Sequence, residues 1–76
     1  MGIIRHPVVA DHIESIGYDL PSKTLEVAYK TGAVFQYAGI PEMEYEKLIN
    51  SPAMDLFMNT HVRGHYEYKM IQASRT

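Results

Sequence analysis

The sequence contains no cysteine, so neither a disulfide nor a thiolate zinc site can stabilise it. It has no apolar run near the roughly 20 residues that cross a membrane. Its 7 lysines and arginines are scattered among 9 acidic residues, for a net charge of −2. Binding through phosphates alone needs clustered basic residues, and the sequence contains no such run. These absences predict a cytoplasmic protein without a membrane partner, whose 76 residues form one domain held together by apolar packing.

Residues 24–37 carry the clearest structural pattern, because apolar and polar side chains alternate on either side of Gly32. Period two around a glycine is typical of a β-hairpin. A two-residue loop at 31–32 would mix polar and apolar side chains on both faces. A three-residue loop at 30–32 gives Gly32 a left-handed conformation and separates the two kinds. We therefore predict the three-residue loop, with one apolar face made of Leu25, Val27, Tyr29, Phe35 and Tyr37.

The segment before the hairpin, residues 12–19, is predicted to be a first strand. Its alternation slips between Ile13 and Ile16, so we expect a bulge or twist, with Gly17 as its place. The turn formers at 19–23 then lead back antiparallel into the hairpin.

The spacing of apolar residues changes from strand-like to helical at Pro41. Pro41 suits the first position of a helix, which Asn50 is expected to end. Ser51 and Pro52 are expected to start a second helix, and Gly64 to end it.

The two ends of the chain complete the predicted domain. Residues 66–70 alternate again and predict a final strand, while residues 1–7 are expected to be an extended lead-in and residues 72–76 a flexible tail. The order β-β-β-α-α-β predicts an α+β fold, in which two short helices cover one face of a small antiparallel sheet of three to four strands. The single domain is expected to span residues 8–71.

Patterns for metal binding or catalysis are weak in this sequence. His61 and His65 have the spacing of two helical ligands, but Gly64 is expected to end the helix before the second one. No His-Glu-x-x-His pattern or nucleophile motif accompanies them. We therefore expect no metal, no cofactor and no catalytic activity.

In their order along the chain, several segments resemble the KTSC domain, named for the C-terminal domain of some lysyl-tRNA synthetases. The resemblance covers residues 8–70, nearly the whole chain. The segments that carry it are 13–19, 25–27, 34–37 and 40–42, together with Gly32, Tyr45, Leu48, Asn59, Val62 and Tyr66. The chain departs from the family pattern at Ala10, Asp11, Ala53, Asp55 and Met58.

The resemblance implies a binding module rather than an enzyme. The family's link to a tRNA-charging enzyme implies RNA or a nucleotide as the ligand, and free-standing members imply a small bacterial or phage protein. The residues expected to bind the ligand are Tyr18, Phe35, Tyr37, Asn59, Arg63 and Tyr66.

The aromatic row of the hairpin, Tyr29, Phe35 and Tyr37, has two interpretations. It is either a platform on which bases stack or the core beneath the two helices. We favour the core, because a chain this short has few other residues to form one.

The alternative function is a protein–protein or self-association module, such as an accessory protein of a phage or mobile element. Five methionines and eight aromatic residues are a large apolar load for one small core. The last strand is also expected to leave a free sheet edge, so we predict a homodimer or larger symmetric oligomer. The methionines expected at a surface are Met54, Met58 and Met70.

Overall fold

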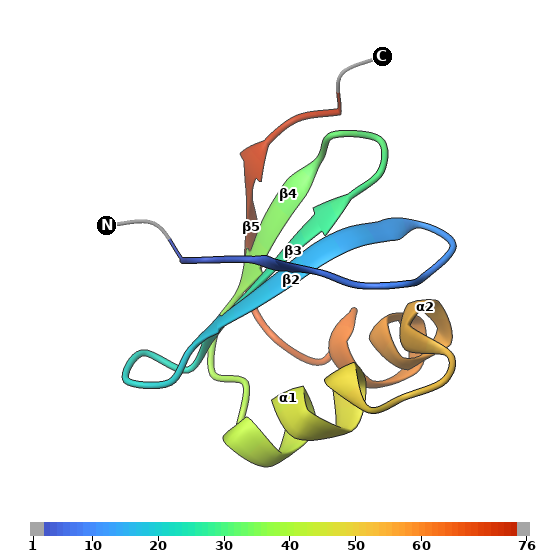
Figure 1. The fold of residues 1–76 in the computed structure, drawn as a ribbon. Coiled ribbons are helices and arrows are strands. Elements are labelled where there is room, and N and C mark those ends of the chain that lie inside the picture. The colour runs from blue at the N-terminus through green and yellow to red at the C-terminus, as the bar shows by residue number, and fades with distance from the viewer. Residues whose placement is uncertain (1–2, 75–76) are drawn as a thin grey trace.

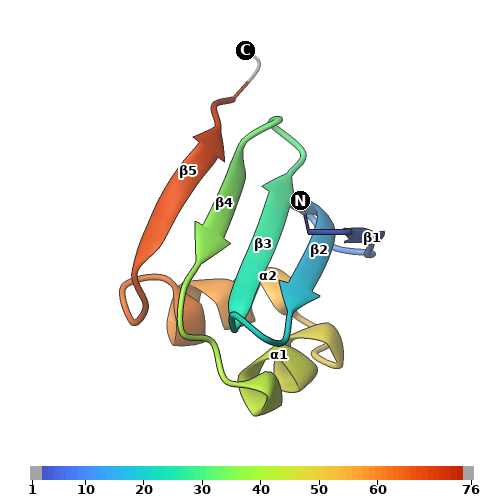
Figure 2. The same cartoon turned by 90° about the vertical axis from the view of Figure 1, so that its left-hand side faces the viewer.

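Five antiparallel strands form one sheet in the order in which they occur along the chain, and two helical segments lie between the last two strands. Figure 1 shows this arrangement in the computed structural model, which describes residues 3–74. Figure 2 shows strands β2 to β5 side by side. The elements are β1 (His6–Pro7), β2 (Ile13–Asp19), β3 (Thr24–Tyr29), β4 (Val34–Tyr37), α1 (Glu42–Ile49), α2 (Met54–Phe57), the π-helix η1 (Met58–Val62) and β5 (Tyr68–Gln72).

The α+β class and the antiparallel sheet with two helices are confirmed, but the predicted three to four strands are too few. The additional strand is β1, where His6 pairs with Ile16 and Pro7 with Ser15. The segment expected to be only a lead-in therefore joins the sheet, because β2 offers it an open edge. At the other end, β5 continues to Gln72, which was expected to begin the tail. Residues 75–76 of that predicted tail lie outside the described residues.

The central hairpin has the predicted three-residue loop. Val27 pairs with Phe35 and Ala28 with Val34, and Gly32 has a φ of 98°. This register places the large apolar side chains of β3 and β4 on the face toward the helices. On the opposite face, the Gln36 side-chain amide donates to the Glu26 carboxylate at 2.9 Å.

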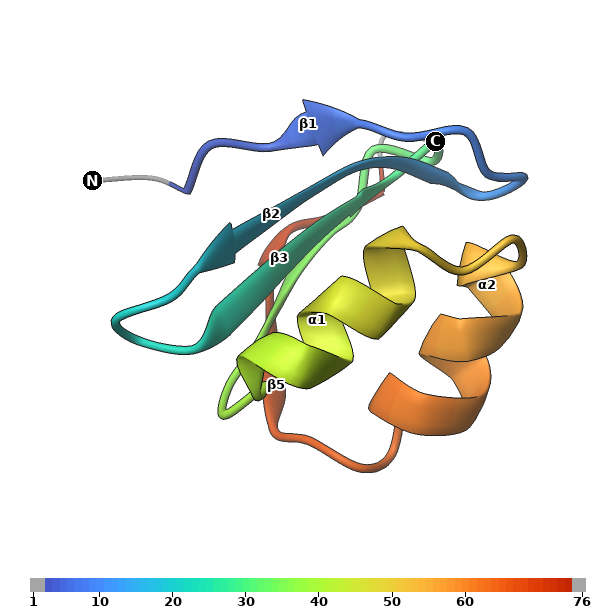
Figure 3. The ribbon, with the colours of Figure 1, turned by 60° about the horizontal axis from the view of Figure 1, so that its bottom comes forward.

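The predicted irregularity of this strand is confirmed, but its predicted place at Gly17 is wrong, because the register of β2 shifts between Ile13 and Ser15. Gly17 has a different role: a Cβ atom there would lie 2.4 Å from the Ile4 carbonyl oxygen. The missing side chain thus allows the N-terminal segment to cross the sheet on the face away from the helices (Figure 3). We call residues 3–7 the strap.

The helices begin later than predicted. Pro41 is the N-cap of α1 rather than its first helical residue, and Asn50 ends α1 as expected. The second helix starts at Met54, because the Ser51 hydroxyl accepts the backbone N–H of Ala53 at 3.1 Å and holds the preceding residues in a turn. The helical segment ends at Val62, before Gly64, whose φ is 83°.

The core lies between β2, β3 and the helices, and it includes Met58, which is 1% exposed. The expectation that Met58 lies at a surface is therefore wrong, because η1 directs it inward. In the described part of the chain, no helix has the length and apolar character needed to span a membrane. The buried cluster comprises Ile13, Ile16, Leu25, Val27, Tyr37, Ile40, Leu48, Met58 and Val62.

Candidate ligand-binding groove

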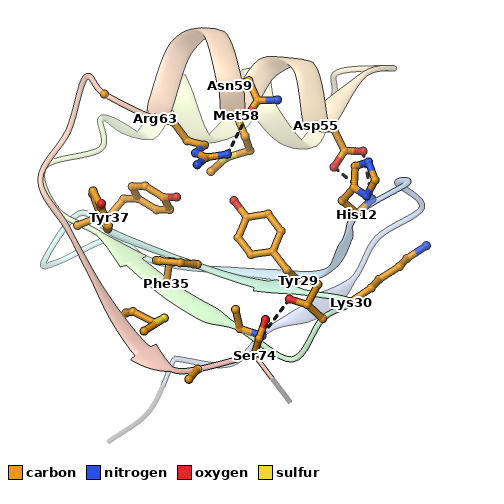
Figure 4. A pocket seen from close by; sticks show the side chains of 16 residues that line it. His12, Tyr29, Lys30, Phe35, Tyr37, Asp55, Met58, Asn59, Arg63 and Ser74 are labelled. Carbon is orange, nitrogen blue, oxygen red and sulfur yellow. Dashed lines mark hydrogen bonds between the residues drawn. The ribbon is translucent and has the colours of Figure 1, made fainter. Parts of the chain in front are cut away.

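An open cavity of about 1070 Å³ separates the outer part of the sheet from the α2–η1 segment (Figure 4). It exists because the helices pack closely over β2 and β3, whereas all residues of β5 are exposed. We call this cavity the groove. Its floor includes Tyr29, Phe35, Tyr68 and Met70 from the sheet, and its wall includes Asp55, Asn59 and Arg63 from the helical segment.

Aromatic rings dominate the floor, and Phe35 lies at their centre. Its ring centroid is 5.7 Å from that of Tyr29 and 5.8 Å from that of Tyr68, both in edge-to-face geometry. Tyr37 is the innermost ring at 3% exposure, while Tyr68 on the edge strand is 63% exposed. The prediction that the aromatic row of the hairpin forms the core therefore holds for Tyr37. Tyr29 and Phe35 are half-buried and line the groove instead.

The wall is shaped by the π-helical turn η1. The Arg63 backbone N–H donates to the Met58 carbonyl at 2.8 Å, a bond five residues back along the chain. Met58 and Val62 point into the core, while Asn59 and Arg63 remain exposed along the groove. The Arg63 guanidinium donates to the Asn59 side-chain oxygen at 3.2 Å, so the two side chains form one polar unit facing the aromatic floor (Figure 4).

Asp55 fixes the position of the wall. Its carboxylate accepts the backbone N–H groups of Asp11 at 2.9 Å and His12 at 3.2 Å, and so joins α2 to the loop before β2. Charge-assisted bonds of this kind are stronger than neutral ones. The side chain of Asp55, which lines the groove, is therefore anchored to the backbone of this loop.

The phenol of Tyr37 is held in its neutral form. Burial raises the pKa of Tyr37 above its ordinary value, the adjacent Tyr29 adds to the increase, and the positive charge of Arg63 opposes it. Tyr37 therefore presents an uncharged ring to the groove, which Arg63 also lines.

The structure brings together four of the six residues that the sequence analysis selected as ligand-binding. Phe35, Tyr37, Asn59 and Arg63 all line the groove, whereas Tyr18 and Tyr66 do not.

Tyr18 instead joins the sheet to the first helix. Its ring stacks on Tyr45 with centroids 4.5 Å apart, and its hydroxyl donates to the Ile40 carbonyl. Tyr66 is half-buried and packs against the core. Both side chains are thus occupied by packing outside the groove.

The groove also contains residues that the site prediction omitted. Tyr68 and Met70 face it because they pair with Tyr37 and Phe35. The alternation of residues 66–70 places Tyr68 and Met70 on one face of a strand, but only the pairing of β5 with β4 brings that face to the hairpin's aromatic row.

The histidines have ordinary surroundings. The His61 ring stacks on Phe57 with centroids 4.4 Å apart, and its Nδ1 lies 2.9 Å from the Thr60 hydroxyl. Within residues 3–74, no three His, Asp or Glu side chains gather closely enough to hold a metal ion.

The fold and the groove define a small α+β domain with a ligand-sized hollow beside its sheet. The KTSC domain matches residues 11–66, so the chain belongs to this family. The crystal structure of the KTSC domain protein YPO2434 from Yersinia pestis superimposes with a TM-score of 0.88 at 27% sequence identity, covering 92% of this chain and 99% of that one. No curated protein sequence matches the chain at a significant level.

Proposed function

We propose that this KTSC domain is a non-catalytic cytoplasmic module that binds a nucleotide unit in the groove, either free or as an exposed nucleotide of single-stranded RNA. The observation that carries the proposal is the aromatic floor formed by Tyr29, Phe35 and Tyr68 opposite Asn59 and Arg63. An aromatic ring accepts a base face by stacking, and each stacked base contributes about 1–3 kcal/mol.

The volume of the groove and the net charge of the protein favour a small ligand over a long nucleic acid. The groove volume of about 1070 Å³ lies just above the range for small-molecule sites, roughly 300–1000 Å³. A net charge of −2 disfavours a long phosphate backbone, which needs many basic contacts. The resemblance to a domain of some lysyl-tRNA synthetases supports an RNA-related ligand and is the second support for the proposal.

The test is a binding titration that compares one exposed floor residue with a tyrosine outside the groove. Nucleoside monophosphates are titrated by calorimetry, and a fluorescein-labelled pentanucleotide RNA by anisotropy at low salt. Tyr68→Leu removes a stacking surface but keeps an apolar side chain, and we expect its affinity to fall roughly 5- to 150-fold. Tyr66→Leu is the matched control and is expected to bind like the wild type. Absence of binding to every ligand at millimolar concentration would refute the proposal.

A second candidate function, self-association, is supported by the exposed edge strand β5. Tyr68 is 63% exposed, Met70 54% and Ile71 46%, so this strand carries several accessible apolar side chains. Pairing of β5 with a second copy would cover them and satisfy the open edge.

The oligomeric state tests this candidate. Light scattering at high protein concentration is expected to give a multiple of 8.7 kDa, and Ile71→Lys, at a position that does not line the groove, is expected to restore the single-chain mass. A single-chain mass for the wild type excludes the candidate.

A further inference from the structure

On the wall of the groove, the Asn59–Arg63 pair presents hydrogen-bond donors, while the Asp55 carboxylate accepts the backbone N–H groups of Asp11 and His12. The side-chain oxygen of Asn59 accepts the Arg63 guanidinium at 3.2 Å, which leaves the Asn59 NH₂ group to face outward. Arginine has no acceptor at all. The reverse orientation of the Asn59 amide would place two donors against each other, so the observed pairing fixes the amide. Within residues 3–74, the Asn59 nitrogen and the remaining guanidinium nitrogens make no other hydrogen bond.

Asn59 and Arg63 are four residues apart, a spacing that places them on the same side of the helical segment, with the core residues Met58 and Val62 beneath them. The Arg63 backbone N–H donates to the Met58 carbonyl, and this bond closes a π-helical turn at the same point. Single π-helical turns of this kind are frequent at functional sites. Asn59 thus acts as a positioning residue for Arg63 and supplies a donor of its own.

A ligand that fits both surfaces needs a flat aromatic face and an edge with two neighbouring acceptors. Guanine has this edge, with N7 and O6 both accepting, and arginine commonly pairs with it through two bonds. Adenine has N7 beside an N6 amino group, which would place a donor against the donors of Asn59 and Arg63. On the edge that faces the major groove of a duplex, cytosine likewise presents an N4 amino donor.

We propose that the groove selects guanine, with the base stacked on the floor at Phe35 and Tyr68 and its N7/O6 edge bound by Arg63 and Asn59. This inference rests on the proposed function and adds the identity of the base. The base is the same in free GMP and in RNA, so the experiment includes both.

The test is calorimetry with GMP, IMP, 7-deaza-GMP and AMP. IMP keeps N7 and O6 and is expected to bind like GMP. AMP and 7-deaza-GMP each lose one acceptor and are expected to bind roughly 5- to 150-fold more weakly. Pentauridylate RNAs with one central G or one central A give the same comparison within RNA.

Two variants separate base selection from general stability. Arg63→Lys removes two-bond recognition, and we expect the ratio of GMP to AMP affinity to fall toward one while AMP binding is unchanged. Asn59→Asp keeps an acceptor for Arg63 but replaces the outward NH₂ group with oxygen, so we expect weaker GMP binding without weaker AMP binding. Lys47→Ala, a loss of positive charge on α1 outside the groove, is the matched control and should change neither.

The outcomes distinguish this inference from the proposed function. Equal affinity for guanine and adenine, both free and in RNA, overturns guanine selection and leaves nucleotide binding intact. Unchanged selectivity in both Arg63→Lys and Asn59→Asp also overturns it. Absence of binding to all four nucleotides and both RNAs overturns both proposals.

Discussion

Replacing Gly17 with alanine tests how the N-terminal strap is held against the sheet. An added Cβ would lie 2.4 Å from the Ile4 carbonyl oxygen and 2.8 Å from Cγ2 of Ile3. The first neighbour is backbone and cannot rotate away, so the strap must move. Its displacement would also separate Arg5 from Glu26, whose side chains approach to 3.4 Å.

The expected cost follows from these contacts. Overpacking a close contact costs about 1–3 kcal/mol, and the lower chain entropy of alanine in the unfolded state offsets about 0.4–1 kcal/mol of it. We therefore expect Gly17→Ala to lower the free energy of unfolding by about 1–2 kcal/mol, and one kcal/mol corresponds to roughly 4–8 °C in the melting temperature of a domain this size.

A double-mutant cycle identifies the strap as the cause. Arg5→Ala in the wild type is expected to cost about 0.5–1 kcal/mol, since this ion pair is only partly exposed. In the Gly17→Ala background it should cost almost nothing, because the contact with Glu26 is already lost. Urea denaturation followed by circular dichroism measures all four proteins. Wild-type stability of Gly17→Ala, or full additivity of the two substitutions, would refute the reasoning.

Four further outcomes are expected. Tyr18→Phe should lower the free energy of unfolding by about 1 kcal/mol, because it removes the hydrogen bond to the Ile40 carbonyl. Its nucleotide affinity in calorimetry should be unchanged, and a loss of binding would show that Tyr18 contacts the ligand. Gly32→Ala should destabilise the hairpin by about 1–2 kcal/mol in thermal melts, because alanine is strained at a φ of 98°. Asp55→Asn should cost about 1 kcal/mol in urea titrations by weakening the contact with the loop before β2. Because the pKa of Tyr37 is raised in the folded protein, the folded and unfolded states both keep the phenol proton below pH 10, and above pH 10 the unfolded state loses it first. The free energy of unfolding should therefore fall above pH 10 by up to about 1.4 kcal/mol per pH unit. The fall should be less steep in Tyr37→Phe, and equal slopes in the two proteins would contradict this.

The sequence predicts the parts of the fold that depend on local patterns. The hairpin register follows from the alternation around Gly32, because a one-residue slip would move every apolar side chain to the wrong face. Strand β1 has no comparable signal: His6 and Pro7 are exposed, and they form a strand only because β2 has an open edge. The close approach of the strap to Gly17 likewise depends on tertiary contact.

The candidate site is predictable as separate residues but not as a site. Phe35 and Arg63 could be selected from the aromatic row and the family pattern. Their position on opposite sides of one groove depends on how far α2 and η1 stand from the outer strands, which no local pattern encodes. The π-helical turn has no sequence signature here, whereas helical spacing alone places Met58 with Val62, and Asn59 with Arg63, on shared faces.

The most direct test of nucleotide binding in the groove is an NMR titration of the ¹⁵N,¹³C-labelled protein with GMP. We predict nuclear Overhauser contacts from the guanine H8 proton to the rings of Phe35 and Tyr68, and chemical-shift changes at the Asn59 side-chain amide. Residues on the opposite face, such as Glu26 and Gln36, should not shift. Shifts confined to that opposite face, or no shifts at millimolar GMP, would contradict the account.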